Sequence, residues 1–470
     1  MDRSAPDLSK ASPSPPPVLP PSSSISSAEA ANIPWMMLER FVFVRNDDDG
    51  SFPDDAAAPM RANSSTSFGD RFTIALLLAA PPGVSRLYVQ WQRGPREPVD
   101  PDSRETLLLT SDRRLFLLST TSRSKLERTR PIQQDFFVFR ASFSAGRSAL
   151  TRLPSCTEPI LLPLHGKEIA VYRWFHHNTI GIVRGRGSDI DKFAVVQLAK
   201  FVDFPGHRKM GAELCVFRSG FPSSKSKDEV AEGNWEVLKL PIHHSDEEFS
   251  DLEGWSTDGT ITFKNSICWV DYHHGGILLY TPALAAGGTE DIISYIRLPI
   301  DNRPRNSLPS QYPLERYRSL CVTGPRNNEQ LKFIDVARKD DAFFGMIRDG
   351  SSFTITCHTF TTTYGHKWHK DADITSKELW HPKSRKSLIP RNAVTTFPLV
   401  SWDEPHLIHF IMSELTNKID MVLLVVVDII KKKAVSVSTY IEGEEDLCGK
   451  HADMVSHRSR LPRSFLPCQF

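Results

Sequence analysis

Long hydrophobic runs are missing from this chain of 470 residues. Its longest apolar stretches, Ile74–Ala80 and Met421–Val427, end at Pro81 and Asp428, far short of the roughly 20 residues that span a bilayer. Residues 1–32 are rich in proline and serine and have no apolar centre of the kind that secretory signals carry. We therefore expect a soluble intracellular protein, cytoplasmic or nuclear, with no membrane partner.

An excess of either charge is also missing. Lysine and arginine number 57 against 56 for aspartate and glutamate, so the net charge is +1. Binding to a phosphate backbone needs a concentrated basic face, and the composition gives no strong nucleic-acid signal. The seven cysteines are odd in number and include no C-x-x-C pair. This pattern fits reduced thiols inside a cell better than a secreted disulfide framework.

Motifs for nucleophilic catalysis and nucleotide binding are absent. The chain has no G-x-S-x-G elbow, and Gly185 and Gly187 begin a G-x-G whose third glycine position holds Ile190. Gly449 and Lys450 lack the upstream glycine of a phosphate loop. The sequence therefore assigns no catalytic and no cofactor-binding residue, and we predict no cofactor and no enzymatic activity.

Histidines and paired carboxylates carry the remaining chemical signals. The spaced histidine pairs stand three residues apart, so on a strand their side chains point to opposite faces and cannot share a metal. These pairs are His366 with His369 and His406 with His409; His176–His177, His243–His244 and His273–His274 are adjacent. The carboxylate pairs Asp189 with Asp191 and Asp371 with Asp373 fit hydrated surface. We therefore assign no metal-binding residue.

Short apolar segments separated by turn residues dominate the chain from residue 33 onward, and such segments predict strands. They include Phe72–Ala80, Arg86–Trp91, Asp135–Arg140, Ile160–Leu164, Phe193–Leu198, Glu213–Arg218, Ser266–Asp271, Gly276–Tyr280, Leu331–Val336 and Phe353–His358. Met421–Ile430 is a predicted strand whose first part, Met421–Val427, is continuously apolar, as expected of a strand buried on both faces. Trp235–Leu240 alternates, as expected of an outer strand. Loops are expected at Gly94–Asp102 and Thr121–Pro131.

A spacing near 50 residues suggests repetition. Cys215, Cys268 and Cys321 are separated by 53 residues each, and two segments end in Leu-Pro-Ile, at Leu240–Ile242 and Leu298–Ile300. A period of this size made only of strands is typical of four-stranded propeller blades, although coincidence also explains the cysteines. We predict an all-β fold, a β-propeller of five to six blade-like units with a strand-rich N-terminal segment.

The predicted organisation has four parts. A Pro/Ser-rich tail that we expect to be disordered covers 1–32, a β-rich region 33–154, a propeller-like domain 155–440 and a C-terminal tail 441–470. Five or six blade-like units fit within 155–440, and the N-terminal region would pack against them or complete the ring. The run Lys431–Lys433 flanks a long apolar strand, where lysines discourage edge-to-edge aggregation; a nuclear-localisation patch is the weaker alternative.

Several segments carry a family resemblance: Trp35–Arg40 (WMMLER), Ala79–Trp91, Cys268–Tyr280 (CWVDYHHGGILLY), Phe397–Met412 and Val425–Val437. In these the chain resembles the domain of unknown function 1618 family, a plant family expanded in grasses. The blades also resemble the propeller regions of plant F-box-associated proteins, without an F-box-like helical segment. His273, His274 and the doubled glycine depart from the family's usual turn. The resemblance implies the fold and no catalytic residues.

The expected function is that of a non-catalytic protein-interaction scaffold with an unidentified protein partner. Propellers present loops around a channel, so we expect the partner at one rim, formed by Ser219–Gly233, Ala285–Asp291 and Asn302–Tyr312. One alternative is a substrate adaptor for ubiquitin-dependent degradation that lacks an F-box. Another is an enzyme that uses the channel as its pocket, which converging His, Asp and Glu side chains would favour.

Overall fold

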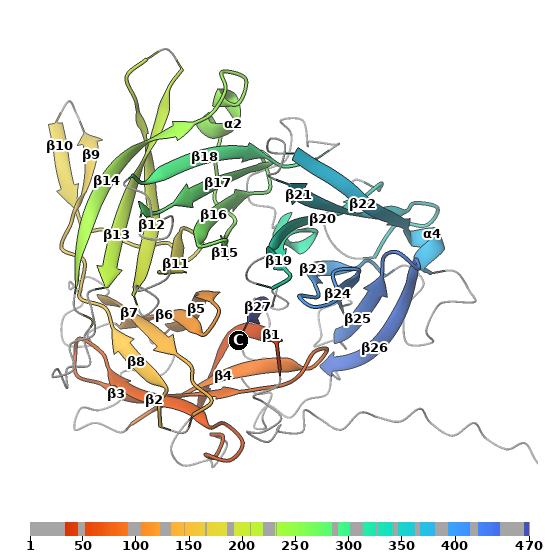
Figure 1. The fold of residues 1–470 in the computed structure, drawn as a ribbon, viewed down its shortest axis with the longest axis horizontal. Helices are drawn as coiled ribbons and strands as arrows, with labels where there is room; N and C mark the ends of the chain where they lie inside the picture. The colour runs from red at the N-terminus through yellow and green to blue at the C-terminus, as the bar shows by residue number, and fades with distance from the viewer. Residues whose placement is uncertain are drawn as a thin grey trace, which may run out of the picture.

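The computed structural model places strands around a common centre (Figure 1). The residues it describes are 33–45, 52–92, 105–122, 133–144, 146–164, 167–185, 192–206, 208–219, 231, 233–283, 290–300, 314–325, 328–340, 342, 346–361, 367–380, 393–413, 422–441 and 465–469. The predicted tail 1–32 and the predicted loop Gly94–Asp102 lie outside these residues, as does most of Thr121–Pro131. Only short helices accompany the strands in this part of the chain: α2 (Phe249–Glu253), η3 (Leu314–Arg316) and α4 (Ser376–Leu379).

Most strands belong to units of four consecutive antiparallel strands. Unit 2 contains β5 (Glu105–Asp112), β6 (Leu115–Ser122), β7 (Gln133–Arg140) and β8 (Ala149–Arg152). Unit 3 contains β11 (Ile180–Arg184), β12 (Phe193–Asp203), β13 (Met210–Ser219) and β14 (Gly233–His243). Unit 4 contains β15 (Gly259–Phe263), β16 (Ser266–Asp271), β17 (Gly276–Thr281) and β18 (Ile292–Arg297). Unit 5 contains β19 (Arg318–Thr323), β20 (Gln330–Arg338), β21 (Phe353–Thr361) and β22 (Lys367–Thr375), and unit 6 contains β23 (Thr396–Val400), β24 (Leu407–Ser413), β25 (Val422–Asp428) and β26 (Lys433–Ile441).

Unit 1 combines strands from both ends of the chain. It contains β1 (Trp35–Arg45), β2 (Met60–Ser65), β3 (Arg71–Leu77), β4 (Val84–Trp91) and β27 (Leu466–Gln469). Strand β1 pairs in parallel with β4 and antiparallel with β27, where Trp35 lies opposite Gln469 and Leu38 opposite Leu466. The late strand therefore completes the unit in which the described chain begins, which closes the ring.

The core consists of apolar clusters between successive units. Separate clusters lie between units 1 and 2, 2 and 3, 3 and 4, and 4 and 5, and one more joins units 5 and 6 to unit 1. Strand β1 shows how the sequence produces this pattern, because alternate side chains of a strand face opposite ways. Met36 and Leu38 belong to the cluster shared with unit 2, whereas Trp35 and Met37 belong to the cluster shared with units 5 and 6. Sheets covered on both faces and arranged in a ring define a β-propeller.

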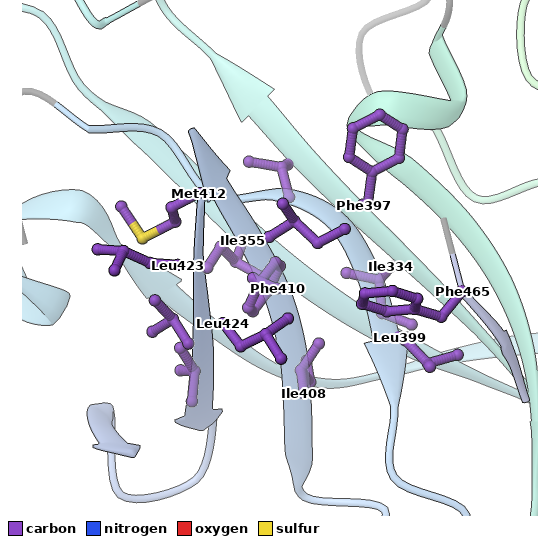
Figure 2. Packing of buried hydrophobic residues seen from close by; sticks show 14 of the residues in the cluster. Ile334, Ile355, Phe397, Leu399, Ile408, Phe410, Met412, Leu423, Leu424 and Phe465 are labelled. Atoms are coloured by element: carbon purple, nitrogen blue, oxygen red, sulfur yellow. The ribbon is translucent and has the colours of Figure 1, made fainter. Parts of the chain in front are cut away.

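The cluster that closes the ring is shown from close by in Figure 2. Phe410 and Leu424 of unit 6 point toward Ile334 and Ile355 of unit 5, and Phe465, which precedes β27, lies beside Leu399. Unit 6 therefore packs against unit 5 and against the segment that leads into the closing strand.

The strand predictions are confirmed in their main features. β25 is buried at every position, as the apolar run predicts. On β14, at the outer edge of unit 3, Trp235 is buried and Glu236 and Lys239 are exposed, but the predicted alternation is interrupted at Val237 and Leu238, which are both half-buried. Leu240–Ile242 and Leu298–Ile300 both lie at the end of a fourth strand, in β14 and after β18. These segments are equivalent positions of neighbouring units.

The interpretation of the 53-residue cysteine spacing as a repeat period is wrong. Cys215 lies on β13, Cys268 on β16 and Cys321 on β19, which are the third, second and first strands of their units. Loops of different length separate the units, so equal spacing in sequence does not give equivalent positions.

The six units are divided between the predicted N-terminal region and the predicted propeller-like domain. Four units lie within 155–440, and residues 33–154 with β27 supply the other two in the described part of the chain. Phe136 and Leu153 of the N-terminal region share one apolar cluster with Phe175 and Phe217. None of the helices in the described segments has the length and apolar character needed to cross a membrane.

Candidate functional site

The centre of the ring is hollow at both ends. Strands β15, β19 and β27 line both hollows through Thr260, Ile261, Leu320, Leu466 and Pro467. We call one hollow the Tyr272 end and the other the Glu329 end, after a residue that lines each. The same inner strands thus line both hollows, and we call the two hollows with their shared wall the channel.

The Tyr272 end is shaped by the turn between β16 and β17. The buried carboxylate of Asp271 accepts hydrogen bonds at 2.8 Å from the backbone N–H groups of His273 and His274 through Oδ1. Its Oδ2 lies 2.7 Å from the N–H of Ser256 and 2.8 Å from Nδ1 of His274. Gly275 follows with φ of 73°, a conformation that glycine adopts without steric cost. Asp271 therefore holds a tight turn, and Tyr272 within that turn faces the channel.

Tyr272 also connects units 4 and 5. Its carbonyl oxygen accepts a hydrogen bond from Nη1 of Arg318, and its hydroxyl oxygen accepts one from the N–H of Leu320 at 3.0 Å. Nε of Arg318 in turn donates to Oδ1 of Asp335 at 3.1 Å. The two bonds of Tyr272 thus hold units 4 and 5 together, and Asp335 positions Arg318 within unit 5.

Asp258 is the perturbed carboxyl group of this end. Its Oδ2 accepts a hydrogen bond from the N–H of Tyr272 at 2.6 Å. Burial raises the pKa of Asp258 to about 7, and the nearby carboxylates Asp271 and Glu315 act in the same direction, against the Tyr272 N–H and Arg318. Asp258 is therefore a carboxyl group that titrates near neutral pH at the mouth of a cavity, a combination common at functional sites.

The Glu329 end contains a second set of buried charges. Oε1 of Glu329 accepts a hydrogen bond from Nη2 of Arg113 at 3.2 Å, and its Oε2 accepts one from the N–H of Lys264 at 2.8 Å. Asp112 accepts a hydrogen bond from the N–H of Arg184 at 2.7 Å, and burial raises the pKa of Asp112. These bonds tie turns of units 2, 3, 4 and 5 to one another.

The channel thus uses its described carboxylates for internal contacts. Asp258, Asp112 and Glu329 each accept a backbone N–H, and the lining of the Tyr272 end includes Leu107 and Leu109. Over the described residues, His, Cys, Asp and Glu side chains form no group of three that could hold a metal ion. The arrangement stabilises the ring. At the Tyr272 end, Asp258 is a carboxyl group whose pKa lies near neutral pH.

A second feature is a hairpin that stands apart from the units. Strands β9 (Ile160–Leu164) and β10 (Lys167–Val171) pair only with each other among the described strands. Large hydrophobic side chains are exposed on and beside it: Leu161 (37%), Leu162 (44%), Ile169 (42%) and Tyr172 (51%). These are four of the nine exposed large hydrophobic residues in the described part of the chain, so apolar surface is concentrated here. An isolated two-stranded hairpin is marginally stable in water, which makes this surface a candidate for a partner.

The two edges of the hairpin differ. On β9, the carbonyl of Leu161 accepts a hydrogen bond from Nζ of Lys200 at 2.6 Å, and Pro163 has no N–H. Both features blunt an edge against strand addition. Leu161 lies opposite Ala170 and Pro163 opposite Glu168. The carbonyl of Leu161 is bonded outside the ladder, so the pair Leu161–Ala170 directs its backbone groups outward. Outward- and inward-facing pairs alternate in an antiparallel ladder, so the pair Pro163–Glu168 does the same. Ala170 and Glu168 therefore direct their backbone groups to the open edge of β10.

Arg173 fixes the base of the hairpin. Its side chain is fully buried and donates to the carbonyls of Glu158 and Pro159, both at 3.0 Å, and to Oε1 of Glu213 at 3.0 Å. The segment before β9 and the residues after β10 are thereby joined to β13. The base of the hairpin is held rigidly while its strands extend outward.

The residues singled out in the sequence fall in different places. The rim segment Asn302–Tyr312 lies outside the described residues, as do most of Ser219–Gly233 and Ala285–Asp291, the pair Asp189 and Asp191, His366, and the pair Gly449 and Lys450. Asp371 accepts hydrogen bonds from Lys332 Nζ at 2.8 Å and Thr359 at 2.6 Å, and Asp373 pairs with Lys370 at 2.6 Å. His409 is buried and its pKa is lowered to about 4 by burial. These side chains form ion pairs and core, and the structure does not bring them together in one site.

Sequence reasoning missed Asp258, Glu329 and Arg173. Each is a single charged residue whose partners lie on other strands or turns, from 14 to 216 residues away in the chain, so no local motif marks it. The sequence predicts the strand Ile160–Leu164, but it does not predict that the strand is exposed, because a run of apolar residues normally predicts burial.

The fold and its site therefore define a β-propeller. Its channel carries carboxylates that are hydrogen-bonded within the protein, and an apolar hairpin projects from its outside. Residues 269–409 match the family model described as "Protein of unknown function (DUF1618)", which supports the resemblance for this part of the chain. A comparison with curated proteins finds no match. Among solved structures, the chain is similar to an α-L-arabinanase of Penicillium chrysogenum complexed with arabinobiose, with 9% identity and a TM-score of 0.24 over 86% of this chain and 85% of that one. A likeness at this TM-score carries no argument about function.

Proposed function

We propose that the protein is a non-catalytic protein-interaction scaffold and that the β9–β10 hairpin is its partner-binding element. The observation that carries the proposal is the concentration of exposed apolar side chains on a hairpin that pairs with no other described strand. The partner that fits is a protein that supplies an extended segment to the open edge of β10. Backbone hydrogen bonds would then come from Ala170 and Glu168, and Leu162 and Ile169 would offer an apolar face.

The test compares proteins retained by tagged full-length variants from the source tissue. Ala170→Pro removes one outward N–H of β10, and Ile169→Lys places a charge on the apolar face. Ile430→Lys is the matched control, because Ile430 is 62% exposed in the turn between β25 and β26, away from the hairpin. We expect a set of proteins that wild type and Ile430→Lys retain and that both hairpin variants lose.

Retention of the same proteins by all variants would contradict the hairpin as the binding element. Ubiquitin-ligase subunits within the hairpin-dependent set would favour the adaptor alternative over a plain scaffold. The hairpin variants must lose these bound proteins while they remain folded. Each variant should therefore keep the wild-type midpoint of thermal unfolding.

A second candidate function, an enzyme using the channel as its pocket, is favoured by Asp258. Its pKa near 7 suits a general acid or base at the mouth of a cavity. Hydrolysis of nitrophenyl esters or glycosides by wild type, lost in Asp258→Asn, would support this candidate. Equal background rates for both proteins across such a panel would count against it.

A further inference from the structure

Cys156 and Cys215 lie together although 59 residues separate them in the sequence. Their Sγ atoms are 3.6 Å apart. Cys215 is fully buried on β13, whereas Cys156 is partly exposed in the segment between β8 and β9. The other described cysteines contact different groups or lie deep in the core: Cys321 contacts Ser319, Cys357 contacts Asp371, Cys468 contacts Ser111, and Cys268 is fully buried.

The two thiols have unequal acidity. The hydrogen bond between the two thiols lowers the pKa of Cys156, and the Glu158 backbone and the guanidinium of Arg173 act in the same direction, against burial and the Glu158 carboxylate. The pKa of Cys215 is raised by its hydrogen bond to Cys156 and by burial. Since the thiolate is the nucleophile, Cys156 is the thiol that reacts first, and it is also the one that solvent reaches.

Little movement is needed to join the two sulfur atoms. A disulfide has an S–S length of about 2.05 Å, so the sulfurs must approach by roughly 1.5 Å. Cys156 belongs to no strand and lies between Pro154 and Glu158, whose carbonyls are held by Trp235 and Arg173. The short stretch between these two anchors can supply the movement while Cys215 stays in its sheet. The bond would tie the connection between units 2 and 3 to β13.

We propose that Cys156 and Cys215 are a reversible oxidation site that forms a disulfide when the protein meets hydrogen peroxide. The Cys156 thiolate attacks one peroxide oxygen, so an S–O bond forms, the O–O bond breaks, and hydroxide leaves and takes up a proton. Cys215 then loses its proton and attacks Sγ of the Cys156 sulfenic acid, so the S–S bond forms and water leaves. Two thiols and one peroxide thus give one disulfide and two waters. This inference does not depend on the proposed function.

The test uses purified, fully reduced full-length protein treated with hydrogen peroxide, then denatured, alkylated and digested for mass spectrometry. We expect wild type to lose two free thiols and to yield a peptide pair joined through Cys156 and Cys215, and dithiothreitol to restore both thiols. Cys156→Ser, a change in a partly exposed segment, should yield no peptide pair containing Cys215. Cys268→Ala is the matched control, since its thiol is buried without a cysteine partner in contact, and it should still yield the Cys156–Cys215 pair.

Two results would overturn the proposal. One is sulfinic acid on Cys156 while Cys215 stays a free thiol, which would show that the pair does not close. The other is a Cys156 that remains reduced while other cysteines react. Cys215→Ser provides a second check, because it should convert Cys156 to sulfenic or sulfinic acid in place of the disulfide.

Discussion

The indole Nε1 of Trp35 donates a hydrogen bond to Oδ1 of Asp403 at 2.8 Å, across 368 residues of sequence. Trp35 begins β1 in unit 1, and Asp403 lies between β23 and β24 in unit 6. The bond therefore crosses the junction at which the ring closes. Oδ1 of Asp403 also accepts a hydrogen bond from Ser401 at 2.7 Å, so it keeps a partner if the indole is removed.

Trp35→Phe should destabilise the protein by about 1 kcal/mol from the lost hydrogen bond, with a further cost from the smaller ring. The measurement is the midpoint of urea unfolding. Trp402→Phe is the matched control, because the buried Nε1 of Trp402 has no hydrogen-bond partner. Trp402→Phe removes an N–H that has no partner, so this variant should lose stability only through its smaller ring and not through a lost hydrogen bond. Equal destabilisation by both substitutions would show that the Trp35–Asp403 bond adds nothing to ring closure.

His409 predicts a loss of stability in acid. Its ring is buried 5.7 Å from the ring of Trp35, and burial lowers its pKa to about 4. The unfolded chain, with a histidine pKa near 6.5, binds the proton more readily, so this contribution is present above pH 6.5 and is lost as pH falls toward 4. Between pH 7 and 4.5 wild type should lose about 2 kcal/mol more than His409→Gln.

The control for this prediction is His369→Gln, since the His369 side chain is exposed on β22. That variant should follow the wild-type pH profile in urea unfolding. If His409→Gln and wild type lose stability in parallel between pH 7 and 4.5, the buried ring is not the cause.

The strands that the sequence predicts are those whose apolar residues are continuous or alternate cleanly. β22, β23 and β27 escaped prediction for separate physical reasons. β22 (KWHKDADIT) is an outer strand with a mostly exposed, polar surface. β23 and β27 each contain a proline, Pro398 and Pro467, which normally argues against a strand.

The candidate sites were less accessible to sequence reasoning than the fold. Glu329 meets Arg113 and Cys156 meets Cys215 only because turns and strands of different units come together. Such pairs depend on the closure of the ring, and no spacing within the chain encodes them locally. The equal spacing of Cys215, Cys268 and Cys321 is the opposite case, because a regular pattern in the sequence corresponds to non-equivalent strands in the structure.

Asp258 predicts that stability falls as the pH rises from acidic to neutral. Its pKa is raised to about 7 by burial, whereas an unfolded aspartate has a pKa near 3.9. The folded protein therefore binds the proton more readily, and its stability falls as pH rises from about 4 to 7. Asp258→Asn keeps an acceptor for the Tyr272 N–H and removes the titration. From pH 5 to 8 the variant should gain about 2 kcal/mol relative to wild type in urea unfolding.

Asp55→Asn is the control for Asp258, because the Asp55 side chain is 87% exposed and its ion pair with Arg61 lies at the surface. That variant should keep the wild-type dependence on pH. A constant difference between Asp258→Asn and wild type at pH 5 and pH 8 would mean that the carboxyl group at the channel mouth is already ionised at pH 5.

Gly181 lies at a close contact between units 3 and 4. A Cβ atom at this position of β11 would lie 2.7 Å from Cγ2 of Ile267 and 2.9 Å from Cγ2 of Thr260, closer than carbon atoms tolerate. Gly181→Ala must therefore push β11 away from β15 and β16, and overpacking of this kind costs about 1–3 kcal/mol. Gly259→Ala on β15 is the matched control, because a Cβ there meets nothing within 4 Å. We expect the thermal midpoint to fall for Gly181→Ala and to stay or rise for Gly259→Ala, since alanine restricts the unfolded chain more than glycine does. Similar midpoints for the two variants would mean that units 3 and 4 are packed less tightly than these distances require.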